Sequence, residues 1–303
     1  MIDNDGRKQW PAGSRDVTVA DEALGITFSM MVMYPAGVPE QVERMGPYKM
    51  ELARGAEPAE GRFPLALISH GTGGTPFVYR TLAHHLARNG FIVGLPEHPF
   101  NNRNDNSLEN TVKNLEYRPR HLRMAGDWFF ENEPFQGKVQ PDAVSIIGHS
   151  MGGYTALAAA GGVPTSLPDE SPDGIPQRVE VTPDSRIRSL VLLAPATVWF
   201  REEGALRGVT VPILMLDAEK DPHTPPYHAQ IVLNGVEDPG KIQYRTVENA
   251  GHYSFLSPFP ASMCHPSFPP SQDPPGFDRE RFHTSLNAEV LKFLVARHGE
   301  GSV

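Results

Sequence analysis

The chain has 303 residues, of which 39% are hydrophobic, so it is long enough for one large domain with a substantial core. Its formal net charge is −9 and its lysines and arginines form no basic cluster, which disfavours nucleic-acid binding. The single cysteine, Cys264, excludes an internal disulfide and a cysteine-based zinc site. No apolar run reaches the length of a membrane span, and Met1 to Lys8 are polar without a signal-peptide pattern, so we expect a cytoplasmic protein.

Short apolar runs rich in branched residues alternate with helix-like segments along the chain. We expect strands at 26–34, 64–69, 91–95, 143–147, 190–193, 213–216 and 243–247. We expect helices at 77–89, at 108–131 with Pro119 as a kink or break, at 154–160 and at 279–297. Continuous apolar strands separated by helices predict an α/β fold, with a mostly parallel central sheet and helices on both faces, in a single domain over residues 1–303.

Two proline-rich stretches, residues 163–183 and 256–276, interrupt this alternation. Long irregular insertions in compact domains are often lids or binding loops, and proline suits an ordered loop without ladder hydrogen bonds. A plain surface excursion is the other interpretation, and the sequence leaves both open. The second stretch begins four residues after a candidate catalytic histidine, His252.

The segment from Gly148 to Gly152 reads Gly-His-Ser-Met-Gly and lies between an expected strand and an Ala-rich helix. This is the Gly-x-Ser-x-Gly pattern, in which a serine occupies a sharp strand-to-helix turn and projects its hydroxyl above the edge of the sheet. Side chains at the flanking positions would clash with the turn, so glycines occupy them. The pattern predicts Ser150 as a nucleophile.

A serine hydroxyl needs a base, because it does not lose its proton near neutral pH. In this architecture the expected chain order is serine, acid, histidine. His252 follows the last expected strand and is therefore the predicted base. The weaker alternatives are His223, His228, His265 and His283.

The predicted acid is Asp221, in the loop after the strand at 213–216. It would hold the imidazole tautomer and stabilise the imidazolium ion. Asp217 and Glu219 in the same loop are alternatives, and each of the three carboxylates is also compatible with a solvated turn or a helix cap.

The segment from His70 to Gly74 (His-Gly-Thr-Gly-Gly) follows the strand at 64–69. Glycines there let backbone N–H groups point at a developing oxyanion, and the amides of Thr72 and Met151 are the predicted donors. A phosphate-binding glycine loop is disfavoured, because the segment lacks a Gly-Lys-Ser/Thr ending and an acidic ribose partner. Five further side chains are candidates for the substrate pocket, with ordinary packing as the alternative: His98, Tyr79, Trp199, Tyr253 and Phe255.

Together these segments resemble the α/β-hydrolase superfamily over most of the chain. More narrowly, the chain resembles the predicted dienelactone-hydrolase and platelet-activating-factor-acetylhydrolase-like group. The residues that carry this resemblance are Tyr34-Pro35, the run from Ser69 to Gly74, Leu82-Ala83, the run from Gly90 to Val93, the run from Pro96 to Pro99, and the run from Gly148 to Gly153. The resemblance implies an α/β-hydrolase fold, a triad of Ser150, Asp221 and His252, oxyanion amides of Thr72 and Met151, no metal or other cofactor, and ester, lactone or short-chain acyl substrates.

Two departures limit the narrower resemblance. The acetylhydrolase-like branch places its acid after the strand that here ends at Leu193-Ala194, and no aspartate follows it. Dienelactone hydrolases use a cysteine nucleophile, where this chain has Ser150. We therefore do not assign the substrates of those families to this chain.

The sequence thus predicts a serine esterase that cleaves a small carboxylic ester or lactone through an acyl-enzyme, with no nucleic-acid partner and no membrane span. An amidase, a peptidase or a biosynthetic acyl-trimming enzyme with the same triad is the alternative. A ligand-binding protein without catalysis on the same fold is a remote third possibility.

Overall fold

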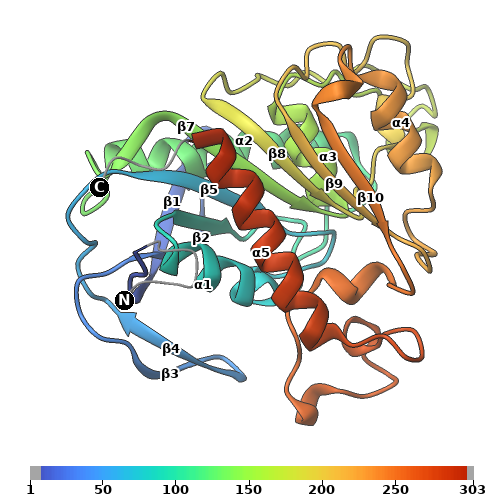
Figure 1. Ribbon diagram of the computed structural model, residues 1–303. Helices are drawn as coiled ribbons and strands as arrows, with labels where there is room; N and C mark the ends of the chain where they lie inside the picture. Colours follow the sequence, from blue (N-terminus) through green and yellow to red (C-terminus); the bar gives the residue numbers. More distant parts are fainter. Residues whose placement is uncertain (1–7, 299–303) are drawn as a thin grey trace.

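The computed structural model describes residues 8–298 and is built on one sheet of ten strands, in the order β10-β9-β8-β7-β5-β6-β2-β1-β4-β3 (Figure 1). From β6 to β10 neighbouring strands are parallel, whereas β2 pairs antiparallel with both β6 and β1. The expected mostly parallel sheet is confirmed. The strands are β1 (Ala12–Asp21), β2 (Ile26–Pro35), β3 (Gln41–Met45), β4 (Tyr48–Arg54), β5 (Phe63–Ser69), β6 (Ile92–Pro96), β7 (Val139–His149), β8 (Ile187–Leu193), β9 (Ile213–Ala218) and β10 (Ile242–Val247).

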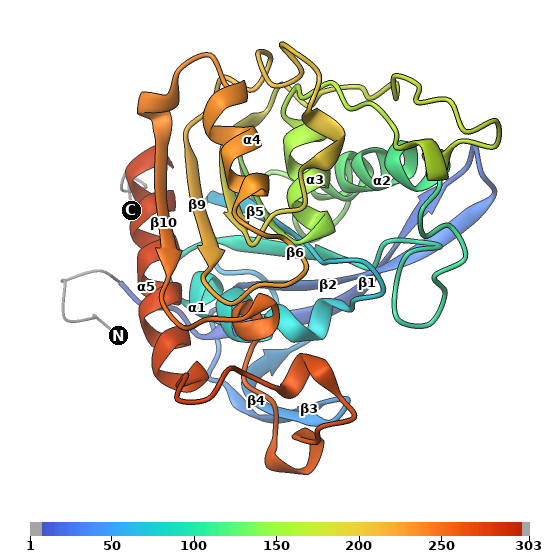
Figure 2. The ribbon, with the colours of Figure 1, turned by 90° about the vertical axis from the view of Figure 1, so that its right-hand side faces the viewer.

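The helices cover both faces of this sheet, as expected (Figure 2). On one face α1 packs against α5, and on the other α2 packs against α3. Two apolar clusters fill the spaces between the sheet and these layers. Because alternate residues of β9 enter different clusters, Met215 one and Leu214 the other, both faces of the strand are buried. The helices are α1 (Arg80–Arg88), α2 (Val112–Glu131), α3 (Met151–Ala159), α4 (Tyr227–Gly235) and α5 (Arg279–His298).

The expected helix at 108–131 differs from α2 in two respects. It begins at Val112, where the Thr111 side chain accepts a hydrogen bond from the amide of Asn114 and caps the helix. It then continues through Pro119 without a break. The expected helix at 154–160 begins earlier, at Met151, directly after Ser150.

The two insertions are ordered by short turns and local hydrogen bonds. Residues 163–183 contain the short 3₁₀ helix Pro168–Glu170 and a bridge between Thr165 and Arg178. Residues 256–276 contain two further 3₁₀ turns, Ala261–Met263 and Pro269–Ser271. Figure 1 shows the second insertion between β10 and α5, at the bottom right.

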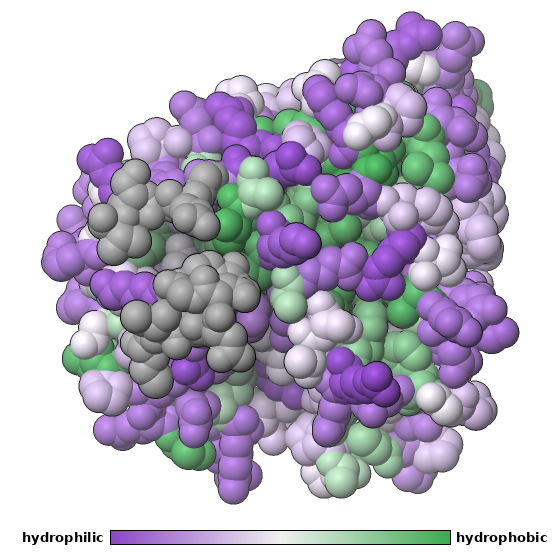
Figure 3. Space-filling view, viewed as in Figure 1, coloured by the Kyte–Doolittle hydropathy of each residue, from purple (hydrophilic) through white to green (hydrophobic). Residues whose placement is uncertain are grey.

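On the face shown in Figure 3, hydrophilic side chains dominate and apolar ones lie between them in small groups. Within the described residues, none of the helices combines the length and the apolar character that crossing a membrane requires. Residues 1–7 of the polar amino-terminal segment lie outside the described part of the chain. The single-domain assignment over residues 1–303 stays a prediction.

Candidate active site

Ser150 occupies the turn between β7 and α3 in a backbone conformation that side chains rarely adopt. Its φ is 55° and its ψ is −121°. Non-glycine residues at positive φ are strained and persist only where the surroundings hold them. Here two backbone hydrogen bonds do so: the Ser150 amide donates to the carbonyl of Leu193 (3.1 Å), and the Ser150 carbonyl accepts from the amide of Ala196 (2.9 Å).

The glycines on either side of Ser150 are needed because backbone lies against them. A Cβ added to Gly148 would overlap the carbonyl of Gly152, and one added to Gly152 would overlap the carbonyl of Ser69 at the end of β5. The steric reason for the Gly-x-Ser-x-Gly pattern is therefore a close contact between α3, β7 and β5.

We expect Gly152→Ala to lower the free energy of unfolding by about 3 kcal/mol or more, since the overlapping atom is backbone and no side chain can move aside. Urea unfolding followed by circular dichroism measures this change. Gly37→Ala is the matched control, because no atom lies within 4 Å of its added Cβ. A Gly152→Ala protein as stable as that control would contradict the packing described.

His252 and Asp221 meet at the carboxyl ends of β10 and β9. The Nδ1 of His252 donates to Oδ2 of Asp221 at 2.7 Å, and both side chains are almost fully buried. Asp221 also accepts backbone hydrogen bonds from His223 (2.7 Å) and Thr224 (2.9 Å), and the Thr224 hydroxyl donates to it (2.6 Å). This arrangement places the imidazole proton on Nδ1 and leaves Nε2 as the basic nitrogen.

The charge state of Asp221 follows from the same contacts. Burial by itself would raise the pKa of Asp221, but the hydrogen bond and charge of His252 and the bonds from Thr224 outweigh it and hold the pKa well below the ordinary value. Asp221 is therefore an anion at neutral pH and can stabilise a positive charge on the imidazole.

The alternative acids have other partners. Asp217 accepts a hydrogen bond from the hydroxyl of Tyr244 (2.7 Å). Glu219 accepts from the amide of Asn249 (2.7 Å) and pairs with Lys220 (3.6 Å). Among the three carboxylates of this loop, Asp221 is the one that the structure joins to His252.

The alternative histidines also have other contacts. Nδ1 of His228 accepts from the amide of Thr197 (2.9 Å), and Nε2 of His283 donates to the carbonyl of Ser254 (3.0 Å). His265 is exposed on the second insertion. His223 is exposed beside His252, with 4.8 Å between the ring centroids.

His149, the residue before Ser150, links three parts of the site and was not singled out from the sequence. Its Nε2 donates to the carbonyl of His252 (3.0 Å), and its Nδ1 accepts from the hydroxyl of Tyr79 (2.9 Å). The Tyr79 oxygen in turn accepts from the amide of Gly71 (3.4 Å). Burial, with the charge of His252 next, lowers the pKa of His149 to about 3, so the ring stays neutral. His149 occupies a variable position of the Gly-x-Ser-x-Gly pattern, and such a position carries no signal for this role.

The loop after β5 passes directly over the nucleophile. A Cβ added to Gly71 would lie 3.1 Å from the Cβ of Ser150. Thr72 follows and is exposed, while Met151 is the first residue of α3, where helix amides have no acceptor within the helix. Thr72 is thus next to Gly71, which lies against Ser150, and Met151 follows Ser150 directly in the chain. The role of their two amides as an oxyanion hole stays a prediction.

Three of the five candidate pocket residues need correction. His98 (0% exposed), Tyr79 (2%) and Phe255 (2%) are buried inside the protein, so they do not present a surface to a substrate. His98 is hydrogen-bonded to Ser69, with 2.8 Å between Nε2 and Oγ. Trp199 and Tyr253 are partly exposed and stay candidates.

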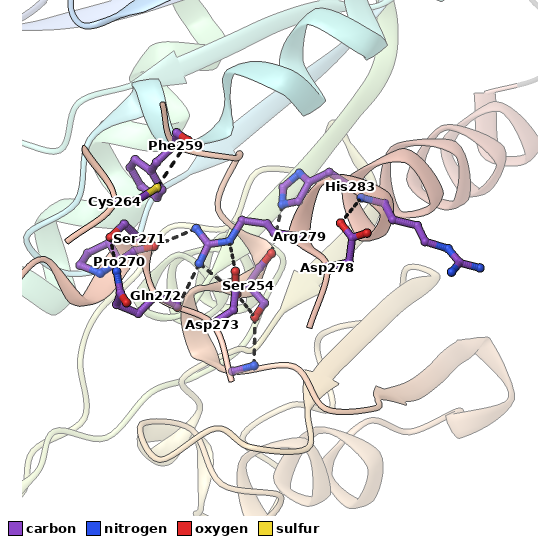
Figure 4. Close-up of polar contacts among 12 residues, drawn as sticks. Ser254, Phe259, Cys264, Pro270, Ser271, Gln272, Asp273, Asp278, Arg279 and His283 are labelled. Atoms are coloured by element: carbon purple, nitrogen blue, oxygen red, sulfur yellow. Dashed lines mark hydrogen bonds and ion pairs between the residues drawn. The ribbon is translucent and has the colours of Figure 1, made fainter. Parts of the chain in front are cut away.

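The second insertion is tied to the segment that carries His252. Figure 4 shows Arg279 directed at Asp273, whose carboxylate also accepts a hydrogen bond from the hydroxyl of Ser254 (2.6 Å). The Ser254 hydroxyl oxygen accepts from the amide of Gly251 (3.0 Å), so the residues on both sides of His252 are held. These hydrogen bonds hold the second insertion against the segment of His252. We did not predict this support from the sequence.

Cys264 is exposed, and its Sγ contacts the carbonyls of Phe259 and Pro260. Among residues 8–298, no group of three or more His, Cys, Asp or Glu side chains is arranged to hold a metal ion.

Comparison with known proteins bears on the fold and on part of the site. A ferulic acid esterase from Streptomyces cinnamoneus is similar in structure, with a TM-score of 0.66 and 18% sequence identity over 95% of this chain and 90% of that chain. The chain has the α/β-hydrolase fold. The model of a family described as Chlorophyllase matches residues 43–168, which include Thr72 and Ser150 but neither Asp221 nor His252. No curated protein sequence matches the chain. The narrower resemblance to the dienelactone-hydrolase and acetylhydrolase-like group stays a prediction.

Proposed function

We propose that this protein is a serine hydrolase that cleaves a small carboxylic ester or lactone with Ser150, His252 and Asp221. The observation that carries the proposal is the buried 2.7 Å hydrogen bond between His252 and Asp221, at the sheet edge where Ser150 holds its strained turn. A buried carboxylate–imidazole pair beside a serine on a strand-to-helix turn is the arrangement that nucleophilic acyl transfer requires.

In the proposed reaction, His252 Nε2 accepts the proton of the Ser150 hydroxyl as the serine oxygen attacks the carbonyl carbon. The amides of Thr72 and Met151 donate hydrogen bonds to the carbonyl oxygen as it becomes negative. The imidazolium, stabilised by Asp221, then gives its proton to the leaving alcohol as the carbon–oxygen bond breaks. A water molecule, deprotonated by His252, attacks the acyl-enzyme and releases the acid.

The comparisons support the ester as the bond that is cleaved. The solved structure of similar fold is an esterase by its name, and the family model covers the segments of the nucleophile and the candidate oxyanion amides. The acyl chain and the alcohol are not assigned by either. A small-molecule substrate follows as part of the proposal, and the cytoplasmic location stays a prediction of the sequence.

The proposal is tested with p-nitrophenyl acetate and a fluorophosphonate probe. We expect a burst of p-nitrophenol of about one equivalent per active site, and covalent labelling of the peptide that contains Ser150. Ser150→Ala, as the control without a nucleophile, should show neither. A folded wild-type protein that neither labels nor shows the burst would favour the ligand-binding alternative. Faster turnover of a matched anilide than of the ester would favour the amidase alternative.

A further inference from the structure

Arg118 of α2 is a fully buried guanidinium that has no carboxylate partner among residues 8–298. Its side chain is among the largest that are completely enclosed. Four neutral oxygens accept its hydrogen bonds: Thr155 Oγ1 (2.9 Å), Asn101 Oδ1 (2.6 Å), Ser69 Oγ (3.3 Å) and the carbonyl of His70. Burial lowers the pKa of Arg118 to about 9, which still leaves it charged at neutral pH. A buried charge without a countercharge is costly, so its presence calls for a reason.

The contacts of Arg118 join the two segments that carry the candidate oxyanion amides. On one side it donates to Ser69 and to the carbonyl of His70, two residues before Thr72. On the other side it donates to Thr155 Oγ1, whose hydroxyl donates to the carbonyl of Met151 (3.0 Å). One rigid, planar side chain therefore connects the end of β5 with the first turn of α3.

The two imidazoles beside Arg118, those of His70 and His98, do not balance its positive charge. Burial, followed by the charge of Arg118, lowers the pKa of His70 to about 3 and that of His98 well below its ordinary value. Both rings are therefore neutral near pH 7. Two residues along the same helix, Arg120 forms a bidentate pair with Asp21 (2.7 and 2.8 Å), which is the ordinary way to anchor an arginine.

We propose that Arg118 is a positioning residue for the oxyanion hole, which fixes the segments of Thr72 and Met151 and stabilises the negative charge of the transition state. The proposal rests on the hydrolase function proposed above. In the resting protein the acceptors of the guanidinium in the described part of the chain are all neutral, so its charge interacts most favourably when the substrate carbonyl oxygen becomes an anion. The effect therefore falls on kcat and on the binding of transition-state analogues, and KM is unaffected.

The test compares Arg118→Met, Arg118→Lys and Thr155→Val with the wild type. For each protein, kcat and KM with p-nitrophenyl acetate are divided by the active-site titre from fluorophosphonate labelling, and Ki is measured for a trifluoromethyl ketone. We expect Arg118→Met to lower kcat about 100-fold and to raise Ki in proportion, as the loss of an oxyanion-hole donor does. Arg118→Lys keeps the charge but cannot span both segments, and Thr155→Val removes one link. Each should lose about tenfold in kcat.

Arg120→Met is the matched control, because it removes an arginine from the same helix and takes the bidentate arginine partner from the buried Asp21. It should lower stability and leave kcat per titrated site unchanged. If Arg118→Met does not fold, the two milder variants decide. Unchanged kcat and Ki per titrated site in folded Arg118→Lys and Thr155→Val would overturn the proposal. An active wild type with unaffected variants refutes only this inference, whereas an inactive, unlabelled wild type refutes the hydrolase function and this inference with it.

Discussion

Replacement of Asp221 by asparagine is expected to lower kcat about 10⁴-fold with little change in KM, as loss of the triad acid does where the remaining geometry is kept. The orientation of the new amide follows from the structure. Two backbone amides, of His223 and Thr224, donate to Oδ1 and would hold the carbonyl oxygen of the asparagine there. Its NH₂ group would then face Nδ1 of His252 in place of the carboxylate oxygen.

That amide favours the wrong tautomer of His252. An NH₂ group donates to Nδ1, so the imidazole proton moves to Nε2, and Nε2 can no longer accept the proton of Ser150. Steady-state kinetics with p-nitrophenyl acetate measure the loss. Asp217→Asn, at the end of β9, and Glu219→Gln, in the following loop, are the controls and should keep kcat within about twofold, because their partners are Tyr244, Asn249 and Lys220. A large loss in Asp217→Asn with an active Asp221→Asn would assign the acid differently.

Apart from β10, in which only Val247 is buried, the strands that the sequence predicted are those with long buried runs. Strands such as β5 and β9 are enclosed along their whole length and so read as continuous apolar runs. Three strands were missed for the opposite reason. β1 and β4 mix buried with exposed positions, and β3, at the edge of the sheet, is largely exposed and polar. α4 was also missed, although α1 and α3, which were predicted, have the same length of nine residues.

The candidate site divides in the same way. Ser150, His252 and Asp221 each follow a strand that the sequence predicted, so local context pointed to them before the structure brought His252 and Asp221 together. Arg118 and His149 have no such context. An arginine in a polar stretch of helix is typical of a surface, and only the packing of α2 against α3 and the end of β5 encloses it. Residues that support a site through tertiary contacts leave no local pattern.

Acidification from pH 7.5 to pH 5 is expected to lower the free energy of unfolding by about 2 kcal/mol for each of His70 and His149, with further losses through His98 and the other buried histidines whose pKa is lowered. Burial is the largest cause in each case: it lowers the pKa of His70 and of His149 to about 3, and that of His98 well below its ordinary value. In the unfolded chain a histidine titrates near about 6.5, so below that pH the unfolded state binds more protons than the folded state. The stabilisation is complete above that pH and is lost progressively as the pH falls towards the folded-state pKa.

The hydrogen bonds explain why the folded protein resists protonation of these rings. Nε2 of His70 accepts from the amide of His98 (3.0 Å), and Nδ1 of His149 accepts from the hydroxyl of Tyr79, so a proton on either nitrogen would break a buried bond. The buried carboxylate Asp21 does not contribute to the change in this pH range. Asp21, whose pKa is lowered chiefly by its hydrogen bond from Arg120, loses its contribution only below its ordinary unfolded pKa of about 4.

Urea unfolding at pH 7.5 and pH 5 measures this loss, which is comparable with the total stability of about 5–15 kcal/mol of a typical domain. His98→Gln removes one titrating ring and should reduce the difference in stability between the two pH values, whatever its effect at pH 7.5. His265→Gln, at an exposed position on the second insertion, is the matched control and should keep the wild-type difference. Equal stability of the wild type at both pH values would mean that these rings accept protons in the folded state. The imidazoles around Arg118 and beside Ser150 would then be charged at pH 5 and not neutral. In the structure as described, the burial that lowers their pKa values keeps them neutral, so Arg118 is the charged group next to the candidate oxyanion amides.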